Sequence, residues 1–510
     1  MKNKNLWRIA LGVGVLTVGV FMTSNAMRLS KPKEFETSEK RVAIYPNYVE
    51  TTLPINIAPT NFYVEEDFDE YRTEIGGRNG DAWIVVGRDV RINERKWRKL
   101  LVANADGTIY FDVYGKKGKK WTKFQRIENR VSSDPIDGWV AYRIIEPGYD
   151  YGNRLMLAQR ATTSFDERVF FDNRATESCI NCHSFQDRRT DRFLFHYRKG
   201  RKNPDGGTIL VDGDSVQKVS GKIKSLGGSC SYPAWRPSGG LVAFSSNDTF
   251  QAFHTLSTQK IEVFDISSDL VLFDSEKNEI KAITRTDDEF ETFPSWAPDG
   301  SSLYYCSAKV VLKSKDNKNN VKASEVAERT NDFRYNLMRI PFDEKTKCFG
   351  APELVVDASS KGRSALFPRT SPDGRFLVYT VVESGTFPIW RPEADLWIKD
   401  LTTGEERALD EINSDDTESF HNWDSSGRWL VFSSRREDGQ YTRLYFTHFD
   451  EQGRASKPFV LPQNDPLNNR RRFKSYNVPE LTIKPIKIST RKLLKASSEK
   501  TRETKEIDVD

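Results

Sequence analysis

The stretch TFPSWAPDGSSLYYCSA, residues 292–308, decides the fold because variants of it recur through the second half of the chain. The others are SYPAWRPSGGLVAFSSND from Ser231, LFPRTSPDGRFLVYTVV from Leu366 and SFHNWDSSGRWLVFSSRR from Ser419. Each combines an aromatic or Pro-x-Trp start, a Pro-Asp-Gly type turn and an apolar run. Proline presets φ and glycine accepts a positive φ, so each turn predicts a tight reversal between two strands. Repeats of this length and spacing predict the blades of a β-propeller.

These repeats resemble the TolB-type propeller repeat over most of residues 190–465. The Trp-x-Pro-Asp-Gly core is intact at Trp296–Gly300, whereas Ser238 replaces the aspartate of the first repeat and Thr370 the tryptophan of the third. The resemblance implies five or six blades, if a weaker blade around FLFHYRKG and a closing one around RLYFTHFDEQG are counted.

Upstream of the repeats, short alternating runs broken by Gly, Pro, Asn and Asp predict antiparallel strands over residues 43–175. We therefore expect an all-β protein, with an amino-terminal β-sandwich-like domain followed by the five- or six-bladed propeller. One run in the first domain, KWRKLLVAN, fits a short helix or a strand. The basic segment 466–510 has few large apolar residues and predicts a partly disordered tail.

The amino terminus has the pattern of an export segment. Lys2, Lys4 and Arg8 precede an uncharged apolar run, so residues 1–27 are expected to be a signal peptide or a membrane anchor, followed by a polar tether over residues 28–42. The protein would then lie on the periplasmic side of the inner membrane, anchored by this segment, or free in the periplasm if it is cleaved. The net charge of +5 over 510 residues gives no argument for nucleic-acid binding.

The chemistry is expected in residues 176–189, which contain Cys179-Ile180-Asn181-Cys182-His183. C-x-x-C-H is the attachment motif of c-type haem. Two thiols at this spacing reach the two vinyl groups of one porphyrin, and the adjacent imidazole binds the iron. The motif therefore predicts one covalent haem c, with thioether bonds to Cys179 and Cys182 and with His183 as the proximal iron ligand. Haem attachment takes place outside the cytoplasm, which agrees with the export segment.

Three other interpretations of the motif stay open. A structural zinc site needs two further Cys or His at suitable spacing, and a redox dithiol normally belongs to a thioredoxin-like unit. A simple C-x-x-C disulfide leaves His183 without a role. Of the other cysteines, Cys230, Cys306 and Cys348, an oxidising compartment allows two to pair, and the sequence does not say which, although Cys306 in the apolar run LYYCSA is expected to be an ordinary buried thiol.

No self-contained cytochrome domain fits around the motif, so we place the haem at the junction of the two predicted domains. The second iron ligand has few candidates, because the chain has only five His and five Met. We rank His196 first, then Met156 and His254. An iron with an open coordination position is the alternative.

The phrases CINCHSF, TDRFLFHYR and SFHNWDSSGRWLVFSSRR resemble those of exported Bacteroidetes-type proteins that pair a haem motif with TolB-like repeats. The resemblance favours a mono-haem c-type cytochrome, more an electron carrier or binding protein than an enzyme, with no catalytic residues assigned. The propeller would be a scaffold or docking platform for a redox partner protein or a membrane electron-transfer complex, in electron transfer or redox sensing.

Two alternatives come from other functional classes. One is a non-catalytic envelope interaction protein, in which the haem is structural and the partner is an envelope protein. The other is a haem-propeller reductase with a second cofactor, for which His254, His421 and His448 are candidate ligands. Fold alone does not decide among the three.

Overall fold

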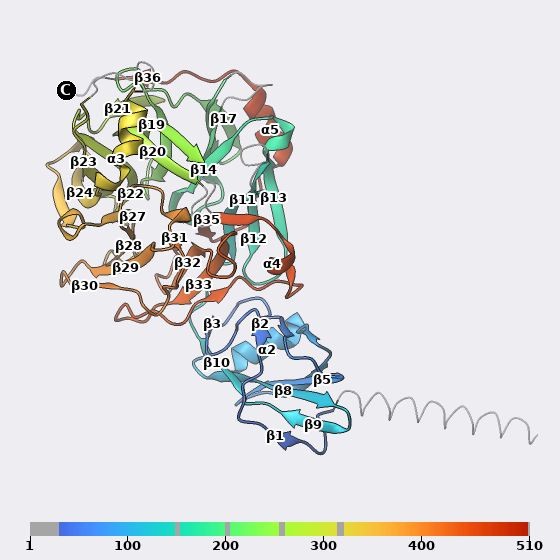
Figure 1. Ribbon diagram of the computed structural model, residues 1–510. Coiled ribbons are helices and arrows are strands. Elements are labelled where there is room, and N and C mark those ends of the chain that lie inside the picture. Colours follow the sequence, from blue (N-terminus) through green and yellow to red (C-terminus); the bar gives the residue numbers. More distant parts are fainter. Residues whose placement is uncertain (1–29, 148–153, 199–204, 254–260, 314–320, 508–510) are drawn as a thin grey trace, which may run out of the picture. The chain divides into compact units, whose positions relative to one another are not determined.

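The computed structural model describes residues 30–147, 154–198, 205–253, 261–313 and 321–507, which form two compact units (Figure 1). The first unit ends at Pro135 and also contains Pro462–Arg471, while the second comprises Ile136–Leu461 and the chain from Arg472 onward. The predicted export segment, residues 1–27, lies outside the described residues. Among the helices that are described, none has the length and apolar character needed to cross a bilayer.

The first unit has the predicted β-sandwich-like character, with sheets of seven and three strands that share aromatic contacts. The larger sheet contains β1 (Glu36–Thr37), β9 (Lys120–Lys123), β8 (Thr108–Lys117), β10 (Ile127–Ser132), β3 (Thr52–Pro54), β5 (Glu70–Gly77) and β6 (Trp83–Val86). The smaller one contains β2 (Ile44–Tyr45), β4 (Phe62–Val64) and β7 (Asp89–Val90). Phe62 on β4 meets Phe111 on β8 edge to face, with ring centroids 5.3 Å apart.

The run KWRKLLVAN of this unit is helical. Helix α2 (Glu94–Ala103) begins after Asn93, whose side chain accepts a hydrogen bond from the Lys96 amide and so caps the first turn. Its buried face includes Trp97, which stacks on Phe111. The short helix α4 (Asn468–Arg471) also belongs to this unit.

The described part of the second unit contains six sheets of four or five strands, which are the blades of a propeller. Blade 1 is β14 (Ile180–Phe185), β15 (Arg192–Tyr197), β16 (Gly207–Asp212) and β17 (Ser215–Val219). Blade 2 is β18 (Ser229–Trp235), β19 (Leu241–Phe253), β20 (Ile261–Asp274), β21 (Glu279–Ala282) and β36 (Lys505–Glu506). Blade 3 is β22 (Glu289–Trp296), β23 (Ser302–Lys309), β24 (Asn336–Asp343), β25 (Cys348–Phe349) and β26 (Glu353–Val356).

Blade 4 is β27 (Ser364–Thr370), β28 (Phe376–Val382), β29 (Asp395–Asp400) and β30 (Glu406–Ala408). Blade 5 is β31 (Glu418–Trp423), β32 (Trp429–Ser434), β33 (Arg443–His448) and β34 (Phe459–Val460). The closing blade is β35 (Ser475–Thr482), β11 (Trp139–Ile145), β12 (Leu155–Ala161) and β13 (Glu167–Asp172). Helices α3 (Val321–Arg329) and α5 (Thr490–Ser498) pack beside β20 and β17.

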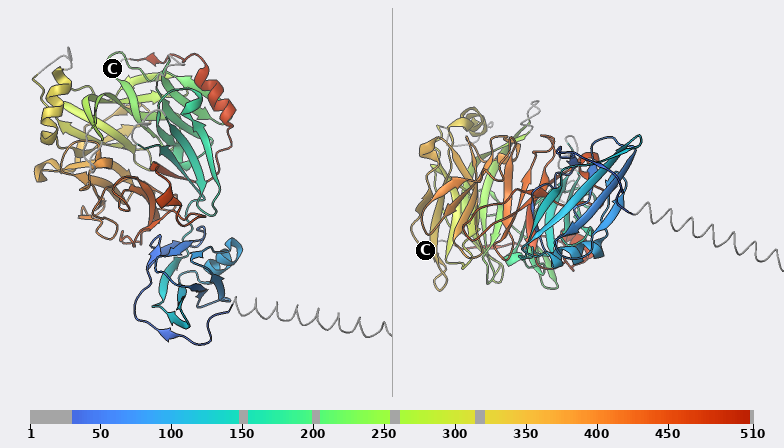
Figure 2. Two further views of the ribbon diagram at one scale, coloured as in Figure 1. Left: turned by 45° about the vertical axis from the view of Figure 1, so that its right-hand side comes forward. Right: turned by 90° about the horizontal axis from the view of Figure 1, so that it is seen from below.

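The ring is closed by a strand from the carboxy-terminal segment. Strand β35 pairs antiparallel with β11, so the closing blade combines three strands from the start of this unit with an inner strand from its end. Figure 2 shows the red β35 next to the teal strands β11 and β12. Inner strands then follow one another in contact around the ring, in the order β14, β18, β22, β27, β31 and β35. The predicted propeller is confirmed, and its blade number is six in the described residues. The expected closing blade around RLYFTHFDEQG is wrong, because this stretch is strand β33 of blade 5.

Three predicted boundaries differ from the structure. The first domain was expected to reach residue 175 but ends at Pro135, because β11 to β13 belong to the propeller. The segment 466–510 was expected to be a partly disordered tail, yet it contains the closing strand, α5 and β36. The haem motif was expected at a junction between domains, but it lies within the propeller, at the start of blade 1.

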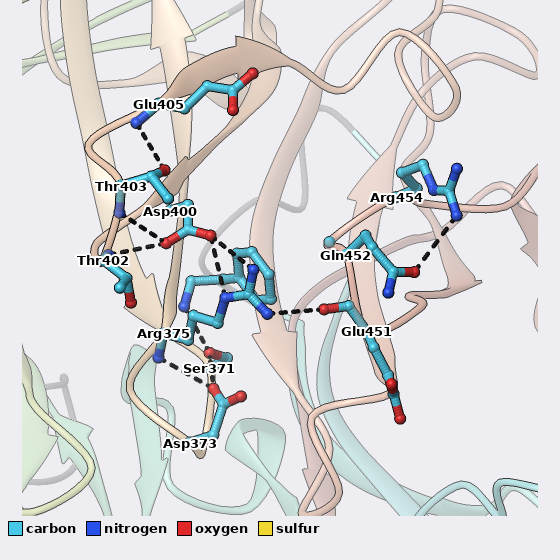
Figure 3. Close-up of polar contacts among 12 residues, drawn as sticks. Ser371, Asp373, Arg375, Asp400, Thr402, Thr403, Glu405, Glu451, Gln452 and Arg454 are labelled. Atoms are coloured by element: carbon cyan, nitrogen blue, oxygen red, sulfur yellow. Dashed lines mark hydrogen bonds and ion pairs between the residues drawn. The ribbon is translucent and has the colours of Figure 1, made fainter.

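The Pro-Asp-Gly turns also join neighbouring blades (Figure 3). In the turn of blade 4, the Asp373 carboxylate accepts hydrogen bonds from the Ser371 hydroxyl and the Arg375 amide. The Arg375 guanidinium then donates to Asp400 on β29 and to the backbone oxygen of Glu451 in blade 5. A local turn signal in the sequence thus also positions a contact between blades.

Closure through β35 makes the propeller depend on residues far along the chain. A chain that ends after Lys474 lacks the inner strand of one blade, which leaves the edge of β11 unpaired and exposes its apolar side chains. We expect this truncated chain to lose its cooperative thermal unfolding transition, measured by circular dichroism. A chain that ends after Lys500 keeps β35 and α5 and should retain the transition. Cooperative unfolding of the shorter chain would contradict the assigned closure.

Candidate functional site

Each of the six inner strands has a bulge at the same place. The first bulge residue has a positive φ between 47° and 54°, and the series is Cys182, Tyr232, Phe293, Phe367, Phe420 and Val478. The next residue is Pro233, Pro294, Pro368 or Pro479 in four blades and His183 or His421 in the other two. Proline is tolerated because a bulge residue has no ladder partner and loses no hydrogen bond.

The first bulge residues form the packing around the propeller axis. The Tyr232 and Phe293 rings have centroids 4.4 Å apart, Phe293 and Phe367 4.3 Å, and Phe367 and Phe420 4.8 Å. Cys182 takes the corresponding position in blade 1. The predicted motif therefore occupies the innermost strand of the propeller, with its second cysteine at the level of the aromatic rings.

Two cavities lie along the axis, and His183 lines both. One has a volume of about 260 Å³ and is lined by residues toward the ends of the inner strands, including Glu480, His421 and Trp423. The other has a volume of about 100 Å³ and is lined by residues at the beginnings of the strands, including Cys182 and Tyr232. Small-molecule sites usually have volumes of roughly 300–1,000 Å³, so the aromatic side chains would have to move for a porphyrin to enter.

His183 is enclosed, and its imidazole makes no hydrogen bond of normal geometry. Its side chain is 1% exposed, and its Nε2 lies 3.6 Å from Oε1 of Glu480 on β35. Burial lowers the pKa of His183 to about 3, with a smaller contribution from the nearby positive charge of Arg143. The ring is therefore neutral at physiological pH, which is the form that binds a metal ion.

Cys182 and Cys179 have different surroundings. Cys182 lines the smaller cavity, and burial raises the pKa of its thiol. Cys179 precedes β14, is half-buried and packs against the apolar cluster between blade 1 and the closing blade. His183 and Cys182 thus fit the predicted haem, whereas Cys179 can reach the same porphyrin only if the extended segment before β14 rearranges.

The predicted second ligands are not gathered at the axis. His196 is buried on β15 with Asn181 as its backbone partner, and it is not among the described residues that line either axial cavity. Met156 is buried on β12, the third strand from the axis in the closing blade. His254 lies outside the described residues. The sequence did not single out Glu480, Arg143, Arg198 or Arg369, all of which line one of the cavities.

His421 shows what a histidine at this repeat position does in a structural role. Its Nε2 is 2.9 Å from the backbone oxygen of Val378 and joins blade 5 to blade 4. His448 packs against Trp429 on β32. Cys230, Cys306 and Cys348 are free thiols in the described residues, and Cys306 is buried as expected.

Comparisons with known proteins find only distant structural neighbours. No family model matches the sequence, and no curated protein matches it. An oligogalacturonate lyase in complex with manganese aligns over 81% of this chain and 99% of its own, at 13% identity and a TM-score of 0.29. Prolyl oligopeptidase B from Galerina marginata covers 69% of this chain and 43% of its own, at 11% identity and a TM-score of 0.36. A DUF4784 family protein from Bacteroides caccae aligns at 6% identity, over 72% of this chain and 95% of its own, with a TM-score of 0.27.

The carboxyl group of Asp265, close to the smaller cavity, has a raised pKa that tests whether this part of the propeller is buried. Asp265 on β20 is the backbone partner of Thr249, which lines that cavity, and it accepts a hydrogen bond of 2.9 Å from the Asn247 amide. Burial raises the pKa of Asp265 to about 7. Between about pH 4 and pH 7 the unfolded chain releases this proton while the folded chain keeps it, so stability falls as the pH rises.

We expect Asp265→Asn to remove that fall. In the wild-type chain, Asp265 lowers the free energy of unfolding by at most ~4 kcal/mol between pH 4 and pH 7. The free energy of unfolding should therefore depend less on pH in the variant, as measured by urea denaturation across this range. Asp248→Asn, which changes an exposed carboxylate on β19, is the control and should leave the pH dependence unchanged. Equal pH profiles for wild type and Asp265→Asn would contradict the assignment.

Proposed function

We propose that this protein is an exported mono-haem c-type cytochrome, in which the propeller holds one covalent haem through Cys179, Cys182 and His183. The observation that carries the proposal is the state of His183. Its imidazole is buried and neutral, makes no hydrogen bond of normal geometry, and lies beside Cys182 on a common cavity. A buried polar group without a hydrogen bond is costly, and an iron ligand bond would satisfy one nitrogen.

The comparison with His421 separates this proposal from a purely structural role. Both histidines follow the positive-φ residue of an inner strand, in the place where four other blades have proline. The His421 Nε2–H donates to the backbone oxygen of Val378 in the neighbouring blade at 2.9 Å, whereas His183 has only weaker contacts with the closing blade, to the Val478 backbone and, at 3.6 Å, to the Glu480 carboxylate. The repeat therefore accounts for the position of His183 in the fold. Its two ring nitrogens make no hydrogen bond of normal geometry, and this supports a role in binding.

When bound, the haem supplies a one-electron redox couple, and the chain contributes ligation and enclosure. His183 offers a neutral nitrogen to the iron, and Cys182 and Cys179 offer the two sulfurs. Phe367 and Phe420 exclude water at the axis, which affects the potential of such a centre. We propose electron transfer or redox sensing with a partner protein outside the cytoplasm. His196 remains the first candidate for a second ligand, because it lies next to the motif on the adjacent strand.

The first test is covalent attachment. The full chain, made in a host with haem-attachment machinery, is expected to show a mass increase of one haem and reversible redox bands in the visible spectrum. Cys179→Ser/Cys182→Ser should lose both, because no thioether can form. Cys348→Ser, which removes an exposed thiol on β25, should keep both. A wild-type mass equal to that of the polypeptide alone would refute the proposal.

The matched pair His183→Ala and His421→Ala tests the ligand. Both changes remove a buried imidazole from the same repeat position, so they have similar costs in packing. Only His183→Ala is expected to change the visible spectrum per haem or to prevent attachment. If His421→Ala has the same spectral effect, or if neither has one, His183 is not the proximal ligand.

A further inference from the structure

The smaller axial cavity has an unusual charge. Three arginines from different blades line it: Arg143 on β11 of the closing blade, Arg198 directly after β15 of blade 1, and Arg369 on β27 of blade 4. No aspartate or glutamate is among the described residues that line it. Guanidinium groups stay protonated in proteins, so the cavity wall has three positive charges and no negative one.

The hydrogen bonds that we observe from these arginine side chains go to neutral groups. The Arg143 Nε donates to the Asn477 side-chain oxygen at 3.0 Å, and an Arg369 nitrogen donates to the Pro368 backbone oxygen at 2.9 Å. Within the described part of the chain, no carboxylate lies within ion-pair distance of any of the three, although Arg369 also lines the larger cavity and is attracted there by Glu480. Arg143 is 6% exposed and Arg369 is partly buried, so bulk water screens their charges poorly.

Several other buried arginines of the propeller are paired with carboxylates. Arg391 lies 3.2 Å from Glu262, Arg435 lies 2.9 Å from Asp416, and Arg236 lies 2.9 Å from Glu344. A buried charge that has no partner costs several kcal/mol, and this fold avoids that cost elsewhere by pairing. The three cavity arginines depart from the pattern at the one place where Cys182 and His183 also line the wall.

The rest of the wall defines the shape of the ligand. Aromatic side chains line the same cavity, among them Tyr232, Phe293, Phe367, Phe387 and Phe420. Guanidinium groups bind carboxylates with two parallel hydrogen bonds, and aromatic walls favour an apolar body. The chemistry that fits is a molecule with an apolar part and at least one carboxylate.

We propose that Arg143, Arg198 and Arg369 form a carboxylate-binding site, and that on the attached haem this site takes the propionates. The inference rests on the proposed function in so far as the ligand is haem. The same chemistry has a second source, a free small carboxylate, which the experiment distinguishes. Nearness to the motif supports the first source, because Arg143 and Arg198 line the same cavity as Cys182 and His183.

The test compares single variants in the full chain. Arg143→Met and Arg198→Met each remove one charge from the cavity, Arg143→Lys keeps the charge but loses the planar fork, and Arg339→Met changes an exposed arginine that pairs with Glu353 on the outside of blade 3. Thermal unfolding identifies any variant that fails to fold. If Arg143→Met does not fold, Arg198→Met decides the test. Among the described residues, the Arg198 side chain makes no hydrogen bond that the fold would lose.

In protein that carries haem, the midpoint potential is measured. Loss of a cation beside a propionate leaves negative charge near the iron and favours the ferric state. We expect Arg143→Met and Arg198→Met to shift the ferric-to-ferrous equilibrium about tenfold, which is about 59 mV downward for one electron. Arg143→Lys should shift it less, and Arg339→Met should leave it unchanged.

Succinate binding, measured by calorimetry at fixed ionic strength, tests the second source. If potentials do not move but succinate binds the wild type and binds Arg143→Met at least tenfold more weakly, the site holds a free carboxylate. If neither effect is found, the carboxylate site is refuted. If the chain carries no haem at all, the proposed function fails, and succinate binding alone then decides whether the carboxylate site exists.

Discussion

Six inner strands converge on one narrow axis, and the packing there is the constraint on which the propeller depends. Each strand meets it with a bulge whose first residue has a positive φ, although none of these six residues is glycine. A left-handed conformation costs roughly 1–2 kcal/mol per L-residue. The contacts that it allows, such as Phe293 between Tyr232 and Phe367, offset the cost. The axis is therefore filled by side chains and divided into two cavities.

The parts of this architecture that are local in sequence could be predicted. The Pro-Asp-Gly turns and the apolar strands after them identify blades 2 to 5, because each signal lies within a few residues. The closing strand could not be found in this way. SYNVPELT stands in a basic segment without a repeat turn, and it becomes a strand only because β11 offers an unpaired edge. Residues 136–172 were assigned to the first domain because the strand that pairs with β11, β35, lies near the other end of the chain.

The residues of the candidate motif were identified from the sequence, but their location in the propeller was not. Cys-His at residues 182–183 corresponds to Tyr-Pro, Phe-Pro and Phe-His in later blades, and an aromatic residue follows two positions later at Phe185, Trp235, Trp296 and Trp423. That spacing was a usable signal that the motif belongs to blade 1. The motif was instead identified from its C-x-x-C-H spacing alone, and so it was placed at the junction of the two predicted domains. The arginines of the cavity gave no sequence signal, because three blades contribute one each.

The six blades are built alike, so differences between equivalent positions of the blades are informative. Six equivalent strands present equivalent positions, so a difference between blades at one position is not required by the fold. His183 and His421 share a position, yet His421 bonds at 2.9 Å to a backbone oxygen of its neighbouring blade, whereas the Nε2 of His183 lies 3.6 Å from the Glu480 carboxylate of its own neighbour. The two axial cavities share walls that include Arg369, yet among the described residues the carboxylates of Glu480 and Asp187 line only the larger one, while Arg143 and Arg198 line only the smaller one. Both departures occur beside Cys182. The packing of the axis explains neither of them, and these two departures are the observations on which the proposed ligand site at this end of the axis rests.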